Sequence, residues 1–164
     1  MERIRIHHFF DIIRDHGKGK LLKPHPYGHA YHTVGNRLIS GEIDQIRLVI
    51  ENDDICCDCS KLVSGHCIDT IHHRADFTSK EKFNDYLDSR IMKTLGLEGG
   101  QIISIEALLD LTCIYLDHIE DLYEGNDPEH TRTRAVNVTR GTHLMKAIIS
   151  GNLSQYTTEE NENG

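Results

Sequence analysis

Apolar residues recur along the chain at two spacings, which predict different secondary structure. Polar and apolar residues alternate over 3–6, and aliphatic residues dominate 46–50, so we predict a short strand in each segment. Elsewhere the apolar positions repeat every three or four residues, which predicts helices over 7–16, 27–40, 78–95, 104–123 and 128–150. The pattern predicts the α+β class, as a mostly helical single domain with a small N-terminal sheet.

Capping signals support three of the predicted helices. Thr78 and Glu81 have the spacing of a capping box, and Ser104 can cap the next helix. Asp127 followed by Pro128 is a common beginning of a helix. We therefore expect each of these helices to begin beside its capping residue.

Length and charge narrow the class of protein. The 164 residues suffice for one domain with its own core, and no apolar run is long enough to span a bilayer. The N-terminus lacks the pattern of a signal peptide, so we expect a cytoplasmic protein without a membrane partner. The formal net charge of −8 disfavours nucleic acid as a partner, because contact with phosphate backbones needs a basic surface.

Four of the five cysteines lie in one short segment. Cys56 and Cys59 have the C-x-x-C spacing that lets two thiolates reach one metal from a single turn, and Cys67 follows after a short loop. In a reducing compartment such clusters typically bind metals rather than form disulfides. We therefore predict a metal-binding α+β domain over 1–152 and a disordered acidic tail over 153–164.

The remaining two cysteines have weaker signals. Cys113 lies beside the apolar stripe of the predicted helix 104–123, so we expect a small buried hydrophobic residue there. Cys57 is adjacent to Cys56, and adjacent side chains usually point apart. We expect Cys57 to contribute less to a metal site than its neighbour.

Three alternatives fit the clustered thiols. A structural zinc ion would take a histidine such as His66, His72 or His73 as its fourth ligand. An iron–sulfur cubane would bind three irons through three thiolates and leave the fourth iron to a non-cysteine ligand or to substrate. A metal-free dithiol would leave Cys57 and Cys67 without a role.

The 12 histidines add possible ligands. If 7–16 is helical, His7 and His8 share a face with Asp11, because Asp11 follows them by four and three residues. We expect this face to lie close to the cysteines.

The segment 17–26 is a predicted loop, because it contains two glycines and two prolines. It is basic, but it lacks the spacing of a nucleotide-binding loop. His25, His29 and His32 line up near the start of the following helix, where we expect a solvated face.

Three short motifs of this chain resemble those of the DUF1284 family, a group of small, largely uncharacterised bacterial and archaeal proteins proposed to bind an iron–sulfur cluster. The motifs are Ile4-Arg5-Ile6-His7-His8-Phe9-Phe10-Asp11, Asp53-Asp54-Ile55-Cys56 with Cys59 and Cys67, and Leu95-Gly96-Leu97-x-x-Gly100. The resemblance covers about residues 3–110 and implies a metal centre rather than a particular reaction. The family pattern has a cysteine where this chain has Asp11, so the resemblance implies that Asp11 can replace a fourth cysteine ligand.

The leading hypothesis is an iron–sulfur protein with a cluster of the 4Fe-4S type, held by three cysteines and a non-cysteine fourth ligand. The candidate ligands are Cys56, Cys59, Cys67, Asp11, His7 and His8. Such a centre would meet a small-molecule substrate or a redox partner. The alternative is a zinc-stabilised interaction module, and the pattern indicates no oligomeric state.

Overall fold

The computed structural model describes residues 1–151, so the predicted tail over 153–164 lies outside the described residues. The described chain contains seven helices and five short strands, and the predicted α+β class, mostly helical with a small N-terminal sheet, is confirmed. In chain order the elements are β1 (Arg3–Ile4), α1 (Ile6–Gly17), α2 (Tyr31–Ile39), β2 (Gln45–Leu48), β3 (Leu62–Val63), β4 (His66–Cys67), α3 (Lys80–Leu95), β5 (Ile102–Ser104), α4 (Ile105–Asp110), α5 (Thr112–Asp117), α6 (Ile119–Leu122) and α7 (Pro128–Ile149). None of the helices within residues 1–151 combines the length and the apolar composition needed to cross a bilayer.

The main sheet has the strand order β1-β2-β5. β1 and β2 are parallel, and β2 and β5 are antiparallel. β2 buries Ile46 and Leu48 and exposes the residues between them, as the period of two requires. The first two strands were predicted, whereas β5 and the β3–β4 hairpin were not, because strands of two or three residues are too short for a periodic signal.

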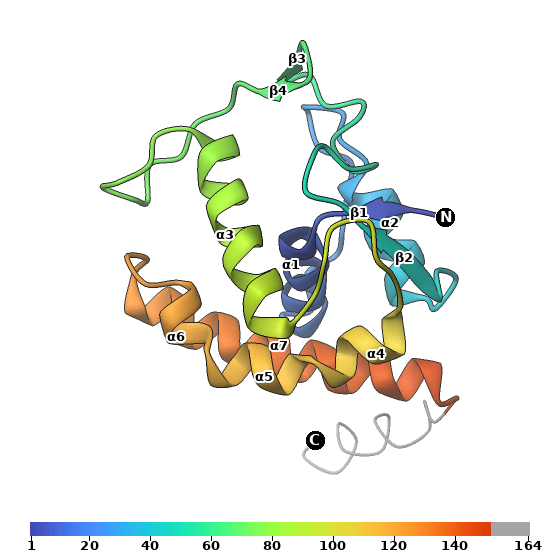
Figure 1. Ribbon diagram of the computed structural model, residues 1–164. Helices are drawn as coiled ribbons and strands as arrows, with labels where there is room; N and C mark the ends of the chain where they lie inside the picture. The colour runs from blue at the N-terminus through green and yellow to red at the C-terminus, as the bar shows by residue number, and fades with distance from the viewer. Residues whose placement is uncertain (152–164) are drawn as a thin grey trace, which may run out of the picture.

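Helix α1 lies at the centre of the molecule, with the sheet on one side, α3 on the other and α7 across its end (Figure 1). Ile6, Phe9, Phe10, Ile12 and Ile13 are fully buried, so the helix is covered on most sides. Half of the α1 residues are polar, and all of these except His16 line a cavity.

Two glycines allow α1 and α7 to approach closely. A Cβ atom added at Gly17 would lie 1.8 Å from the backbone oxygen of Asn137, and one added at Gly141 would lie 2.0 Å from the oxygen of Ile13. The absence of a side chain at these two positions sets the distance between the helices.

The predicted helix over 104–123 is interrupted, and this part of the prediction is wrong. Helix α4 ends at Asp110 and α5 at Asp117, with Leu111 and His118 between the segments. Side chains compete for the backbone acceptors here, since Thr112 Oγ1 donates to the oxygen of Leu108 and His118 Nδ1 contacts that of Ile114.

Because the continuous stripe does not exist, the prediction that Cys113 is buried is also wrong. The residue is exposed, and its thiol donates to the oxygen of Asp110.

The caps follow the sequence signals with one difference. Ser104 accepts a hydrogen bond from the amide of Ala107, and Asp127 accepts one from that of Glu129, as predicted. Before α3, however, the N-cap is Ser79 rather than Thr78, because the backbone oxygen of Thr78 instead accepts a hydrogen bond from the amide of residue 71.

Replacing Gly17 by Ala tests the contact between α1 and α7. The new methyl group would overlap backbone atoms that cannot move aside, so we expect the free energy of unfolding to fall by about 3 kcal/mol. Urea denaturation measures this change. Gly99→Ala is the control, because the atoms nearest to its added Cβ belong to the exposed side chain of Ile50. Equal stability of the two variants would contradict the close approach.

Candidate metal centre

The buried carboxylate of Asp53 joins three parts of the site. Its Oδ2 accepts hydrogen bonds from the amide of Arg5 (2.9 Å) and from His8 Nδ1 (2.7 Å). Its Oδ1 accepts from the amides of Ile55 and Cys56, at 3.2 Å each. One side chain therefore fixes the start of α1, the ring of His8 and the start of the cysteine segment.

A second buried carboxylate, Asp88 of α3, holds the other histidine. Asp88 Oδ1 accepts from the amide of His7 (2.9 Å) and contacts His7 Nδ1 (2.8 Å). Its Oδ2 accepts from Arg5 Nε at 2.6 Å. Asp88 thus satisfies an amide in the first turn of α1, which has no partner inside the helix.

Both histidine rings are therefore oriented through Nδ1, and Nε2 is the nitrogen of each ring that can act as a ligand. The two ring centroids lie 4.1 Å apart. Metal-binding histidines commonly have such a carboxylate on the nitrogen that does not bind the metal. The pair on α1 has the arrangement expected beside a metal.

Three cysteines line one cavity together with these histidines. Cys56, Cys59 and Cys67 are half-buried and free of disulfides, and they lie with His7 and His8 around a volume of about 610 Å³. We call this volume the cysteine cavity. The structure therefore brings the three predicted thiols and the predicted histidine pair to the same place.

Within residues 1–151, one group of potential ligands converges closely enough to hold a metal ion. Each of His8, Asp53 and Cys56 offers one ligand atom, and these atoms all lie within 4.8 Å of one another. Cys59 and Cys67 line the cavity outside this group. The described chain thus contains a group that could hold a metal, with two further thiols beside it.

Burial and Asp53 determine the protonation of the group. Burial, together with the negative charge of Asp53, raises the pKa of the Cys56 thiol to about 12. Burial also acts to raise the pKa of Asp53, but His8 and the amide of Arg5 lower it to about 2. With its pKa raised this far, Cys56 is a neutral thiol at pH 7, and a thiolate next to the ionised Asp53 would need a cation such as a metal ion beside it.

The two histidines respond oppositely to their surroundings. Burial lowers the pKa of His7, and the charge of His8 adds to this effect. Burial acts in the same direction on His8, but the carboxylate of Asp53 outweighs it and the pKa of His8 is raised.

Asp11 also lines the cysteine cavity, but its carboxylate already has partners. Its Oδ1 accepts from Arg14 Nη1 at 3.0 Å and from Arg134 Nη1 at 2.9 Å. Burial acts to raise its pKa, but Arg134 and Arg14 hold that pKa well below its usual range. The structure therefore places Asp11 near the cysteines and in ion pairs with two arginines.

Contrary to the expected solvated face, His25 and His29 also line the cysteine cavity, whereas four other candidate residues do not. Cys57 is exposed, and its thiol donates to the oxygen of Asp54. The histidines considered as zinc ligands, His66, His72 and His73, are exposed and are not among the residues lining the cysteine cavity.

Sequence reasoning missed the roles of two acidic residues. Asp53 stands in a motif used for the family resemblance, but nothing in the motif indicated that its side chain is buried. Asp88 follows Leu87 within the apolar stripe of α3, and a carboxylate on a buried face was the signal that could have identified it.

The fold and the site define an α+β protein with a candidate metal centre at the start of its central helix. No family model, curated protein or solved structure matches the chain. The resemblance to the DUF1284 family therefore stays a prediction.

Replacing Asp53 by Asn tests the anchoring carboxylate. We expect the free energy of unfolding of the metal-free protein to fall by about 2 kcal/mol at pH 7, because His8 and the amide of Arg5 lose a charged acceptor. The pKa of Asp53 is lowered from 3.8 to about 2, so its stabilising effect is present above about pH 4 and is lost as the pH falls towards 2. Urea denaturation should show the difference from wild type shrinking over that range.

The matched control is Asp58→Asn, an exposed residue of the same segment. We expect it to change stability by less than about 0.5 kcal/mol. A constant difference between Asp53→Asn and wild type from pH 7 to pH 2 would contradict the assigned role.

Proposed function

We propose that this protein binds an iron–sulfur cluster in the cysteine cavity. The sulfur ligands are Cys56, Cys59 and Cys67, and the non-cysteine ligand is His8 through Nε2. The observation that carries the proposal is that three free, half-buried cysteines line one cavity with a histidine whose Nδ1 contacts a buried carboxylate. When bound, such a cluster supplies a centre for electron transfer or for Lewis-acid chemistry.

In this proposal Asp53 is the hydrogen-bond partner of the ligands rather than a ligand. Both of its oxygens already accept two hydrogen bonds each, so coordination would compete with contacts that hold the site together. A carboxylate in this position orients the histidine and raises its basicity as a ligand.

His8 is favoured over Asp11 for the fourth position. Binding through Asp11 would weaken its ion pairs with Arg14 and Arg134, whereas His8 Nε2 can bind while Nδ1 keeps its contact with Asp53. Asp11 and His7 then complete the wall of the cavity beside the cluster.

The spacing of the three thiols favours a cluster over a single metal ion. Ligands of one tetrahedral zinc ion lie about 3.8 Å apart, because they share one centre. Cys59 and Cys67 fall outside the group that converges within 4.8 Å, which is compatible with thiolates that bind different irons of a larger centre. The resemblance to the DUF1284 family points in the same direction. The proposed partner of the centre is a small-molecule substrate or a cytoplasmic redox partner.

Zinc is the second candidate, and one observation favours it. The close group of His8, Asp53 and Cys56 contains the ligand types that zinc prefers. In that case the site stabilises the fold of an interaction module.

Anaerobic purification with metal analysis separates these candidates. We expect a brown protein that contains iron and acid-labile sulfide, and we expect Cys59→Ser to lose most of both because one thiolate ligand is missing. Cys113→Ser is the control, since this exposed cysteine lies away from the cavity. A colourless protein with stoichiometric zinc would replace the first proposal by the second.

The fourth ligand is tested by comparing His8→Ala with Asp11→Asn. We expect His8→Ala to lower the affinity for the centre by at least about tenfold, and His8→Cys to restore it, because a thiolate can occupy the same position. Asp11→Asn should retain the centre, and His72→Ala is an exposed histidine control. Iron content and the visible spectrum provide the measurement. Loss of iron in Asp11→Asn but not in His8→Ala would assign the ligand to Asp11.

A further inference from the structure

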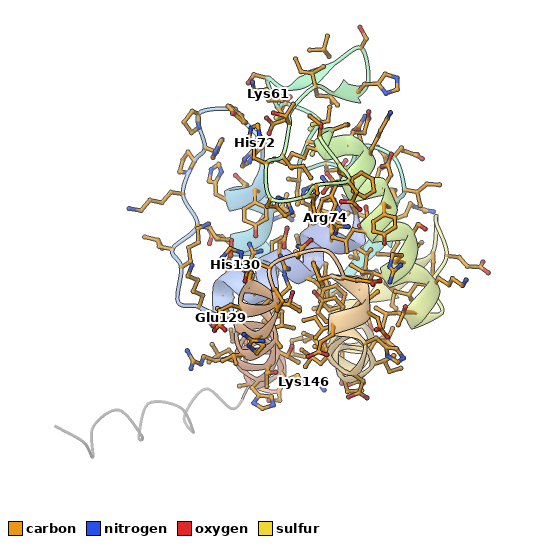
Figure 2. The ribbon with its side chains drawn as sticks, turned by 90° about the vertical axis from the view of Figure 1, so that its left-hand side faces the viewer. Lys61, His72, Arg74, Glu129, His130 and Lys146 are labelled. Carbon is orange, nitrogen blue, oxygen red and sulfur yellow. The ribbon has the colours of Figure 1, made fainter. Side chains whose placement is uncertain are left out.

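A second cavity lies where the end of α1 meets the start of α7, and the cluster proposal does not use it. Its volume is about 350 Å³, near the lower end of the roughly 300–1,000 Å³ typical of small-molecule sites. Figure 2 views the molecule from this side, with Arg74 above and His130 at the start of α7. We call it the basic cavity, for the residues Arg14, Lys18, Lys20, His73, His130 and Arg134 that line it.

The net charge of this cavity is positive, whereas the net charge of the whole chain is negative. Two arginines and two lysines line it, against the single carboxylate of Asp15. Asp11, which pairs with both arginines from behind, supplies one further negative charge. The local net charge is therefore about +2, in a chain whose formal net charge is −8.

The contacts show which cations remain available. Arg134 is held by Asp11 through Nη1, and its guanidinium lies 4.5 Å from the centre of the Tyr123 ring. These two contacts fix the orientation of Arg134 while its other nitrogens form no ion pair with residues 1–151. Lys18 likewise has no ion pair among those residues, and Lys20 reaches Asp15 only at 3.4 Å.

Side chains rather than backbone amides would form this site. The glycine-containing turn after α1 has its amides in use, because those of Lys18, Gly19 and Lys20 donate to carbonyl oxygens of α1 at 2.9 to 3.0 Å. The turn is therefore a helix end and not a phosphate-binding loop, in agreement with its sequence. Its two lysines line the cavity together with Arg134 of α7.

A titratable neighbour responds to the same positive field. Burial lowers the pKa of His73, and the charges of Arg74, His130 and Arg134 lower it further. No carboxylate offsets these charges on the ring.

We propose that the basic cavity binds a small molecule that carries a phosphate group. A phosphate monoester has a charge of about −1.5 to −2 at pH 7 and three acceptor oxygens, which matches a local net charge of about +2 with several N–H donors. Thr133 also lines the cavity, and its hydroxyl can donate to the same oxygens, whereas the hydroxyl of Thr131 donates to the backbone oxygen of Asp127.

The phosphate site adjoins the cysteine cavity but does not depend on a metal. Arg14, Asp15 and Lys20 line both cavities. A molecule whose phosphate is held by Lys18 and Arg134 therefore lies in a cavity that shares a wall with the cysteine cavity.

Calorimetric titration of the purified protein tests this site, with inorganic phosphate and glycerol 3-phosphate as probes at constant ionic strength. We expect both probes to bind, glycerol 3-phosphate more tightly, while chloride and succinate do not. Lys18→Glu should weaken binding of glycerol 3-phosphate by at least about tenfold, because it replaces an unpartnered cation by an anion. Iron content should stay at the wild-type level, since Lys18 is not a residue of the cysteine cavity.

Lys82→Glu is the matched control, because it makes the same change of charge at an exposed lysine of α3 that lines neither cavity. We expect it to change the affinity by less than about twofold. Equal weakening by the two variants would show a general charge effect and overturn the site. Binding of succinate as tight as that of glycerol 3-phosphate would overturn the assignment to phosphate, and so would the absence of binding by both phosphate probes.

Discussion

The buried carboxylate of Asp53 is the constraint on which the candidate site depends. An ionised side chain without exposure is costly to bury, and four hydrogen bonds offset this cost. The donors of those bonds are the amide of Arg5 just before α1, the ring of His8 and two amides of the cysteine segment. The same group that is expensive to bury thereby fixes three segments relative to one another. Asp88 repeats the arrangement from α3, so the first turn of α1 is held from two sides.

Helix α1 connects this site with the rest of the molecule. Its apolar residues form the middle of the core, and close contact with α7 is possible because Gly17 and Gly141 have no side chains. Its polar residues lie in sequence along the cavities, with His7 and His8 at the cysteines and Arg14 at the wall shared with the basic cavity. The ion pairs of Asp11 with Arg14 and Arg134 lie between the two regions. A change at one cavity therefore acts on a helix that also lines the other.

The sequence was informative where a signal is local and strong. Helical periodicity predicted the fold class, and the spacing of Cys56, Cys59 and Cys67 predicted thiols that the structure brings to one cavity. The histidine pair was found from its position on a helix face. The break within 104–123 was missed because side-chain bonds from Thr112 and His118 leave the apolar pattern unchanged.

Local sequence signals could not predict the contacts between segments that are distant along the chain. Asp88 is distant in sequence from His7, and Arg134 from Asp11, so no spacing rule links either pair. Residues of such pairs line both cavities, so the charges of the cavities could not be predicted without the fold.

The most direct test of the account is a crystal structure of anaerobically prepared protein, with anomalous scattering measured at the iron and zinc absorption edges. We expect an iron signal in the cysteine cavity, beside the sulfur of Cys56 and the Nε2 atom of His8, with Asp53 still in contact with His8 Nδ1. A metal signal elsewhere in the molecule, or a metal-loaded protein in which Cys56, Cys59 and Cys67 do not contact the metal, would contradict it.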